Sequence, residues 1–170
     1  RRSLLVFSLS YHRCLWVARF CDIIQSENET KGGISMNLNQ RINDAAQYIK
    51  ARITEAPSIG LILGSGLGDF ADSLENRVVI PFAEIPDFPQ PTVEGHAGAF
   101  VIGSCQGKTV VALQGRIHYY EGHPQQIITI PVRVMALLGV KQIVLTNACG
   151  GVNLNFAPGD LMLISDHINY

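Results

Sequence analysis

The chain has 170 residues with a formal net charge of −1, and 47% of its residues are hydrophobic against 16% charged. This length predicts one domain of ordinary size, and the hydrophobic share excludes intrinsic disorder. A nearly neutral chain has no electrostatic basis for binding nucleic acid or an anionic membrane, so we expect neither as a partner. The four cysteines include no C-x-x-C pair. This argues against a zinc site and a disulfide framework, and it favours a reducing, cytoplasmic location.

The first 35 residues differ in composition from the rest. The apolar run Leu4–Leu9 is soon interrupted by His12, and it is too short to span a bilayer, which takes about 20 apolar residues. The segment is similar to a short signal or transit peptide. The alternative, which we prefer, is a non-native extension with the natural start at Met36. We therefore expect a non-native or disordered extension over residues 1–35 and a single domain over residues 36–170.

From Asn37 onward, hydrophobic patterns of helical and strand type alternate. Helical spacing predicts a helix that has Asn37 or Asn39 as its N-terminal cap and is ended by Pro57. Strands are predicted at Ile59–Leu63, Val78–Phe82, Ala99–Ile102, Thr109–Leu113, Gln142–Thr146 and Leu161–Ile164. A further helix is predicted over Pro124–Leu138, with a kink or a late start at Pro131. Strands interleaved with helices predict an α/β fold with ligand chemistry at strand ends.

Glycine-rich turns follow or precede several of these strands. In Gly64–Gly68, backbone N–H groups and the Ser65 hydroxyl have the chemistry to hold phosphate oxygens, although a tight turn without a ligand explains the residues equally well. The spacing is neither that of a Walker loop nor G-x-G-x-x-G. His96 lies in a second turn of small residues, where a surface histidine is the plainer interpretation.

The segment Gly115–Pro124 carries the strongest chemical pattern. In an extended conformation Arg116, His118 and Tyr120 share one face. Arg116 supplies a planar fork suited to phosphate, His118 a second donor, and Tyr120 an aromatic wall for a sugar or base. An ordinary strand end rarely concentrates such residues between two glycines, so we predict an anion site here.

The small residues of Thr146–Asn153 leave room for a flat ligand. We interpret Cys149 as a small buried thiol, because a nucleophilic cysteine needs a histidine or asparagine in contact. Asp166 and His167 form a polar pair without a third ligand, so no metal site is predicted.

Together these segments resemble the purine nucleoside phosphorylases of the trimeric type, and most closely the bacterial ones. The matching segments, in the order and approximate spacing of the family, are Gly64–Gly68, Thr92–Gly98, Gly115–Pro124, Thr146–Asn153 and Gly159–Asn169. The resemblance covers about Met36 to Tyr170. It implies a mixed central β-sheet flanked by helices, in the three-layer arrangement of the family and incomplete at the C-terminus. Residues 36–170 would be the N-terminal portion of a single phosphorylase domain.

The resemblance also assigns site residues. Those expected to bind phosphate are Ser65, His96, Arg116, His118 and the backbone of Ala148. Those expected to contact the nucleoside are Tyr120, at the ribose, and Ala148, Cys149 and Gly150, at the purine. His118 is expected to act in catalysis by positioning phosphate. Glu121 and His123 are expected to be structural or subunit-contact residues.

The implied reaction is reversible phosphorolysis of purine nucleosides, with orthophosphate as co-substrate, no metal or organic cofactor, and a homotrimer when full length. The family's chain continues past Tyr170 with residues that recognise the purine, so we expect the 170-residue chain alone to be poorly folded or inactive. The alternatives are a methylthioadenosine phosphorylase of the same family, a non-catalytic phosphate- or nucleoside-binding fragment, or a truncated product without function. The segment Tyr120–His123 argues for the purine nucleoside enzyme.

Overall fold

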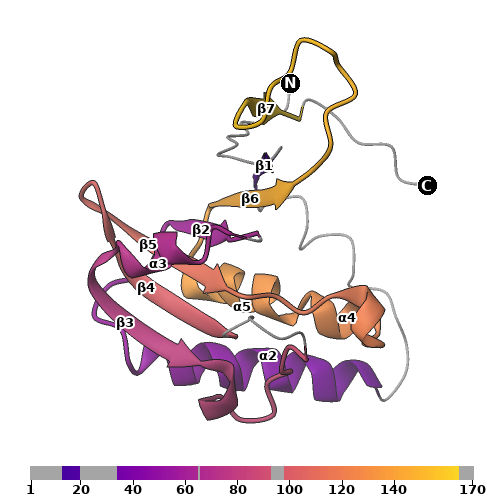
Figure 1. Ribbon diagram of the computed structural model, residues 1–170. Helices are drawn as coiled ribbons and strands as arrows, with labels where there is room; N and C mark the ends of the chain where they lie inside the picture. The colour runs from indigo at the N-terminus through magenta and orange to yellow at the C-terminus, as the bar shows by residue number, and fades with distance from the viewer. Residues whose placement is uncertain (1–12, 20–33, 65, 93–97, 165–170) are drawn as a thin grey trace.

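The computed structural model describes residues 13–19, 34–64, 66–92 and 98–164 (Figure 1). The strands are β1 (Arg13–Arg19), β2 (Ile59–Ile62), β3 (Glu75–Pro81), β4 (Ala99–Cys105), β5 (Lys108–Gln114), β6 (Gln142–Ala148) and β7 (Leu161–Leu163). The helices are α2 (Ile34–Lys50), α3 (Asp69–Asp72), α4 (Gln125–Ile128) and α5 (Ile130–Leu138), with 3-10 turns η2 (Phe82–Glu84) and η3 (Tyr119–Glu121). Within these residues, none of the helices has the length and apolar character that crossing a bilayer requires.

The strands of the described residues form one mixed sheet in the order β3-β4-β5-β2-β6-β1-β7. β2 pairs in parallel with β5 and with β6. β4 pairs antiparallel with β3 and with β5. Helices α2 and α5 lie side by side on one side of the sheet (Figure 1). The prediction of a mixed central sheet flanked by helices is therefore confirmed.

β1 lies inside the segment that we expected to be a non-native or disordered extension. Arg13–Arg19 pairs antiparallel with β6 and, over its first residues, parallel with β7. The first described helix, α2, begins at Ile34, before Met36. The non-native origin of residues 1–35 stays a prediction, but part of that segment extends the sheet.

Alternate residues of β4 and β5 face opposite layers, as the pleat of a strand requires. Those packed in the larger core with α2 and α5 are Phe100, Ile102, Val111 and Leu113. Those packed in a smaller core with Ala71 of α3 are Val101, Val110 and Ala112. Burial on both faces explains why these strands read as continuous apolar runs in the sequence.

The expected break near Pro131 is confirmed. α4 ends at Ile128, and α5 begins at Ile130 with Pro131 in its first turn. Proline fits there because the first turn of a helix leaves its N–H groups unbonded. The expected cap at Asn37 or Asn39 is wrong, since both residues lie inside α2. The short helix α3 was not predicted.

Candidate functional site

Three loops meet at one edge of the sheet. β2 lies between β5 and β6 and is parallel to both, so Ile62 is level with Leu113 on one side and Leu145 on the other. The carboxyl ends of these strands therefore coincide, which is where α/β sheets place ligand sites. The segments that follow the three strands are those singled out in the sequence.

The loop after β2 is closely packed against the end of β6. The Gly64 N–H donates a 2.6 Å hydrogen bond to the buried Thr146 hydroxyl. A Cβ atom on Gly64 would lie 2.4 Å from the Thr146 carbonyl oxygen and 3.1 Å from the Asn147 Cα. Only glycine permits this close approach of the two backbones, which explains on steric grounds why the loop begins with glycine.

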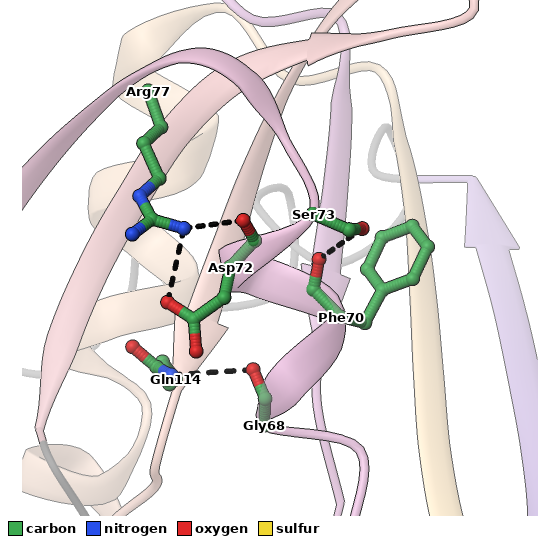
Figure 2. A network of polar contacts seen from close by, with 6 residues as sticks. All are labelled: Gly68, Phe70, Asp72, Ser73, Arg77 and Gln114. Atoms are coloured by element: carbon green, nitrogen blue, oxygen red, sulfur yellow. Dashed lines mark hydrogen bonds and ion pairs between the residues drawn. The ribbon is translucent and has the colours of Figure 1, made fainter.

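The same loop is also tied to β5. The Leu67 N–H donates to the Gly64 carbonyl at 3.1 Å, which closes a tight turn. Figure 2 shows the Gln114 side-chain amide, at the end of β5, directed at the Gly68 carbonyl, and the distance is 3.2 Å. The predicted phosphate ligand Ser65 lies outside the described residues.

Beyond Gly68, helix α3 is fixed to the start of β3. The Arg77 guanidinium contacts both the carboxylate of Asp72, at 3.2 Å, and its backbone carbonyl (Figure 2). The Ser73 hydroxyl donates to the Phe70 carbonyl at 2.7 Å. Both groups of the ion pair are exposed, so it adds little to stability. It restrains the end of the helix that follows the glycine-rich turn.

Arg116 reaches the same edge from the loop after β5. Its guanidinium donates to the Thr146 carbonyl at 3.4 Å. Burial lowers the pKa of Arg116, and Tyr120 opposes this shift. An arginine in this state keeps its charge at neutral pH, and a partly desolvated guanidinium attracts anions more strongly than an exposed one.

His118 and Tyr120 lie together, as predicted, but not in the expected conformation. Their rings are stacked, with centroids 4.8 Å apart and planes 12° apart. The expected extended segment is wrong beyond His118, because Tyr119–Glu121 forms the 3-10 turn η3. The Tyr120 side chain is 73% exposed, so the face of its ring away from His118 is accessible.

Glu121 connects this turn to the loop that follows β3. Its carboxylate accepts hydrogen bonds from the His118 N–H at 2.5 Å and from the Thr92 N–H and hydroxyl at 2.5 and 2.7 Å. Desolvation raises the pKa of Glu121, but the hydrogen bonds from Thr92 and His118 outweigh it and lower the pKa to about 2. Glu121 is therefore ionised and structural, which agrees with our expectation. His96, in the segment after Thr92, lies outside the described residues.

The loop after β6 differs in part from the prediction. Ala148 and Gly150 are exposed. Cys149 is half-buried and disulfide-bonded, so the expectation of a small buried thiol is wrong at this position. Cysteine spacing excludes a local C-x-x-C pair, but it says nothing of a pair that the fold brings together. The Asp166–His167 pair lies outside the described residues.

Comparison with known proteins identifies the class. The profile of the phosphorylase superfamily matches residues 58–170, so the chain belongs to that superfamily. It is 59% identical over 128 residues to purine nucleoside phosphorylase 1 of Geobacillus stearothermophilus, with 75% of this chain and 47% of the relative covered. It is 48% identical over 126 residues to the purine nucleoside phosphorylase of Bos taurus, covering 74% and 44%. The chain thus spans about half the length of these relatives.

A solved structure supports the same class. Isoform 2 of purine nucleoside phosphorylase from Schistosoma mansoni, in complex with cytosine and ribose-1-phosphate, superposes with a TM-score of 0.56 at 50% identity. The superposition covers 59% of this chain and 35% of that one. At this identity the similarity extends beyond the fold.

Three residues of this edge were missed in the sequence. Thr146 was noted only as part of a small-residue segment, and Gln114 and Thr92 were given no role. Each acts through a hydrogen bond to a residue distant in the sequence, and side-chain type alone does not reveal such a bond. Glu121 stands three residues after His118, the separation of a capping box, and that spacing was the one available indication.

Proposed function

We propose that the protein is a purine nucleoside phosphorylase, which cleaves purine ribonucleosides and deoxyribonucleosides with orthophosphate in purine salvage. The observation that carries the proposal is the hydrogen bond from the Arg116 guanidinium to the Thr146 carbonyl. This bond places the guanidinium beside the glycine-rich turn after β2. The names of the relatives support this substrate class over methylthioadenosine.

In the proposed reaction an oxygen of orthophosphate forms a bond to the anomeric carbon of the nucleoside. The bond from that carbon to the purine nitrogen breaks, and its electron pair leaves with the base. The departing base takes up the proton of the hydrogen phosphate, so the products are a free purine and ribose 1-phosphate or its deoxy analogue. The transition state has oxocarbenium character, so a phosphate dianion held in position both stabilises the cation and attacks it.

Arg116 and His118, with Ser65, His96 and the backbone of Ala148, are the proposed phosphate ligands. Charge-assisted hydrogen bonds from a guanidinium are strong and directional, which suits a dianion. The exposed face of the Tyr120 ring would contact the ribose.

Cys149 and Gly150 would line the purine pocket. Residues that recognise the base are expected elsewhere in a full-length chain. We propose that the reaction needs no metal or organic cofactor, and that the full-length enzyme is a cytoplasmic homotrimer.

The test measures hypoxanthine release from inosine with and without phosphate, using the full-length gene product and the 170-residue chain. We expect phosphate-dependent release from the full-length product and none from the 170-residue chain. Methylthioadenosine serves as the competing substrate. Absence of release from the full-length product, or faster cleavage of methylthioadenosine than of inosine, would overturn the proposal.

A matched pair of variants locates the phosphate site. Arg116→Ala is expected to raise the KM for phosphate by about tenfold or more, because it removes hydrogen bonds to a charged group. Lys108→Ala removes an exposed cation at the opposite end of β5 and is expected to leave that KM unchanged. Equal effects of the two changes would mean that net charge, not the site, attracts phosphate.

A further inference from the structure

Thr146 is the one polar residue among those described that is almost fully buried, at 5% exposed. It lies near the carboxyl end of β6, one residue beyond Leu145, which pairs with the last residue of β2. Burial of a hydroxyl is unfavourable unless it is hydrogen-bonded, so its partners indicate why it is there.

Both hydrogen-bonding capacities of this hydroxyl are used. Its oxygen accepts from the Gly64 N–H at 2.6 Å, and its hydrogen is donated to the Ile62 carbonyl at 3.1 Å. The ladder between β2 and β6 ends at Ile62. Beyond the last paired residue of β2, the hydroxyl therefore accepts the hydrogen bond of the buried Gly64 N–H, at the point where the chain leaves the sheet.

The backbone of Thr146 contacts the loop after β5, which carries Arg116. The Thr146 carbonyl accepts from the Arg116 guanidinium at 3.4 Å. That carbonyl is also the atom nearest to where a Gly64 Cβ would stand. One residue of β6 thus contacts the loop after β2 through its side chain and the loop after β5 through its backbone.

We propose that Thr146 is a positioning residue of the phosphate site. It does not touch phosphate itself. Its hydroxyl fixes Gly64 and its carbonyl orients Arg116, so the glycine-rich turn and the guanidinium are held at a set separation before phosphate arrives. Such preorganisation lowers the cost of ordering these groups on binding. The proposal rests on the proposed function for the identity of the anion.

The test compares Thr146→Val, which replaces the hydroxyl by a methyl group of similar size, with Thr146→Ser, which keeps the hydroxyl. Both are made in the full-length gene product. We expect Thr146→Val to raise the KM and Kd for inorganic phosphate by about tenfold, because a Gly64 turn that has lost this hydrogen bond must be ordered again when phosphate binds. Thr146→Ser should restore both constants to within about threefold of wild type, and the KM for inosine should change little in either variant.

Ile143→Val serves as the control for general damage to β6, since Ile143 is buried in the same strand and lies in the main core. It should lower the melting temperature without changing phosphate affinity. The proposal is overturned if Thr146→Val binds phosphate like wild type, if serine fails to restore binding, or if Ile143→Val weakens binding equally. Should Thr146→Val fail to fold, Thr146→Ala removes the hydroxyl without adding a methyl group.

Phosphate binding measured by calorimetry separates this proposal from the proposed function. If wild type binds phosphate but does not cleave nucleosides, the proposed function fails, and the comparison of Kd values still decides the role of Thr146. If wild type binds no phosphate, both are overturned.

Discussion

The substitution Gly64→Ala tests how tightly the loop after β2 is packed against β6. The added Cβ would lie 2.4 Å from the Thr146 carbonyl oxygen, whereas real Cβ atoms stay at least 3.0 Å from their neighbours. Backbone must therefore move by about 0.6 Å. Overpacking of this kind costs about 1–3 kcal/mol, and weakening the Gly64 hydrogen bond to the Thr146 hydroxyl adds about 1 kcal/mol.

The expected loss is thus about 2–4 kcal/mol, a large part of the roughly 5–15 kcal/mol that holds a domain folded. In the full-length gene product, at about 2–4 °C per kcal/mol, the melting temperature should fall by about 4–16 °C. Urea unfolding gives the free energy directly, and a thermal scan followed by circular dichroism gives the melting temperature. Phosphate affinity, measured on the folded fraction, should also fall, because the turn moves away from Arg116.

Gly68→Ala is the matched control in the same loop. Gly68 has helical dihedral angles, φ −54° and ψ −39°, and a Cβ there would meet the Gln114 side chain at an ordinary 3.9 Å. This change is expected to be neutral or to stabilise by about 0.4–1 kcal/mol, through the lower entropy of the unfolded chain. The steric reasoning is refuted if Gly64→Ala is as stable as wild type, or if the two substitutions destabilise equally.

Three further perturbations are open to direct measurement. The pKa of Glu121 is lowered from 4.5 to about 2, so the stability from its bonds to Thr92 is complete above about pH 4.5 and is lost as the pH falls through 2. Glu121→Gln should make the free energy of unfolding depend less on pH between about 2 and 4.5. An unchanged pH dependence in that range would contradict this. The Phe100 ring centroid lies 5.2 Å from that of Phe82. Phe100→Ala should lower the free energy of unfolding, measured in urea, by about 3–5 kcal/mol. A loss below about 1 kcal/mol would show that the core closes over the gap. His123→Phe removes a buried Nε2 that has no partner among the described residues and should stabilise by about 1 kcal/mol. Destabilisation would show that this nitrogen is bonded.

The sheet was predictable because its strands are short apolar runs separated by turn residues. Their boundaries were less so. β3 begins at Glu75 rather than Val78, because Glu75 pairs with Ser104 beyond a β-bulge of polar residues that carry no apolar pattern. β6 continues to Ala148 because Asn147 and Ala148 pair with β1, which the sequence pattern did not predict.

The candidate site was predictable only where side-chain chemistry is concentrated. Arg116, His118 and Tyr120 stood out by residue type, and the structure brings the last two into ring contact. Thr146 and Gln114 did not stand out, because they act on backbone groups 82 and 46 residues away. Hydrogen bonds across such separations exist only once the strands have paired, and a pattern within a short window of sequence does not contain them.

The position of β2 in the middle of the sheet has a consequence for the order of folding. β4 and β5 form a hairpin closed by Gln106 and Gly107, both with positive φ, as a two-residue turn of type I′ requires. Such a hairpin forms in about 1–10 μs. β2 must instead pair in parallel with two strands much further along the chain, and closing such long loops slows folding. We therefore expect the loops after β2, β5 and β6 to meet only in the slow phase, so that refolding chains recover phosphate binding together with the completed sheet and not before it.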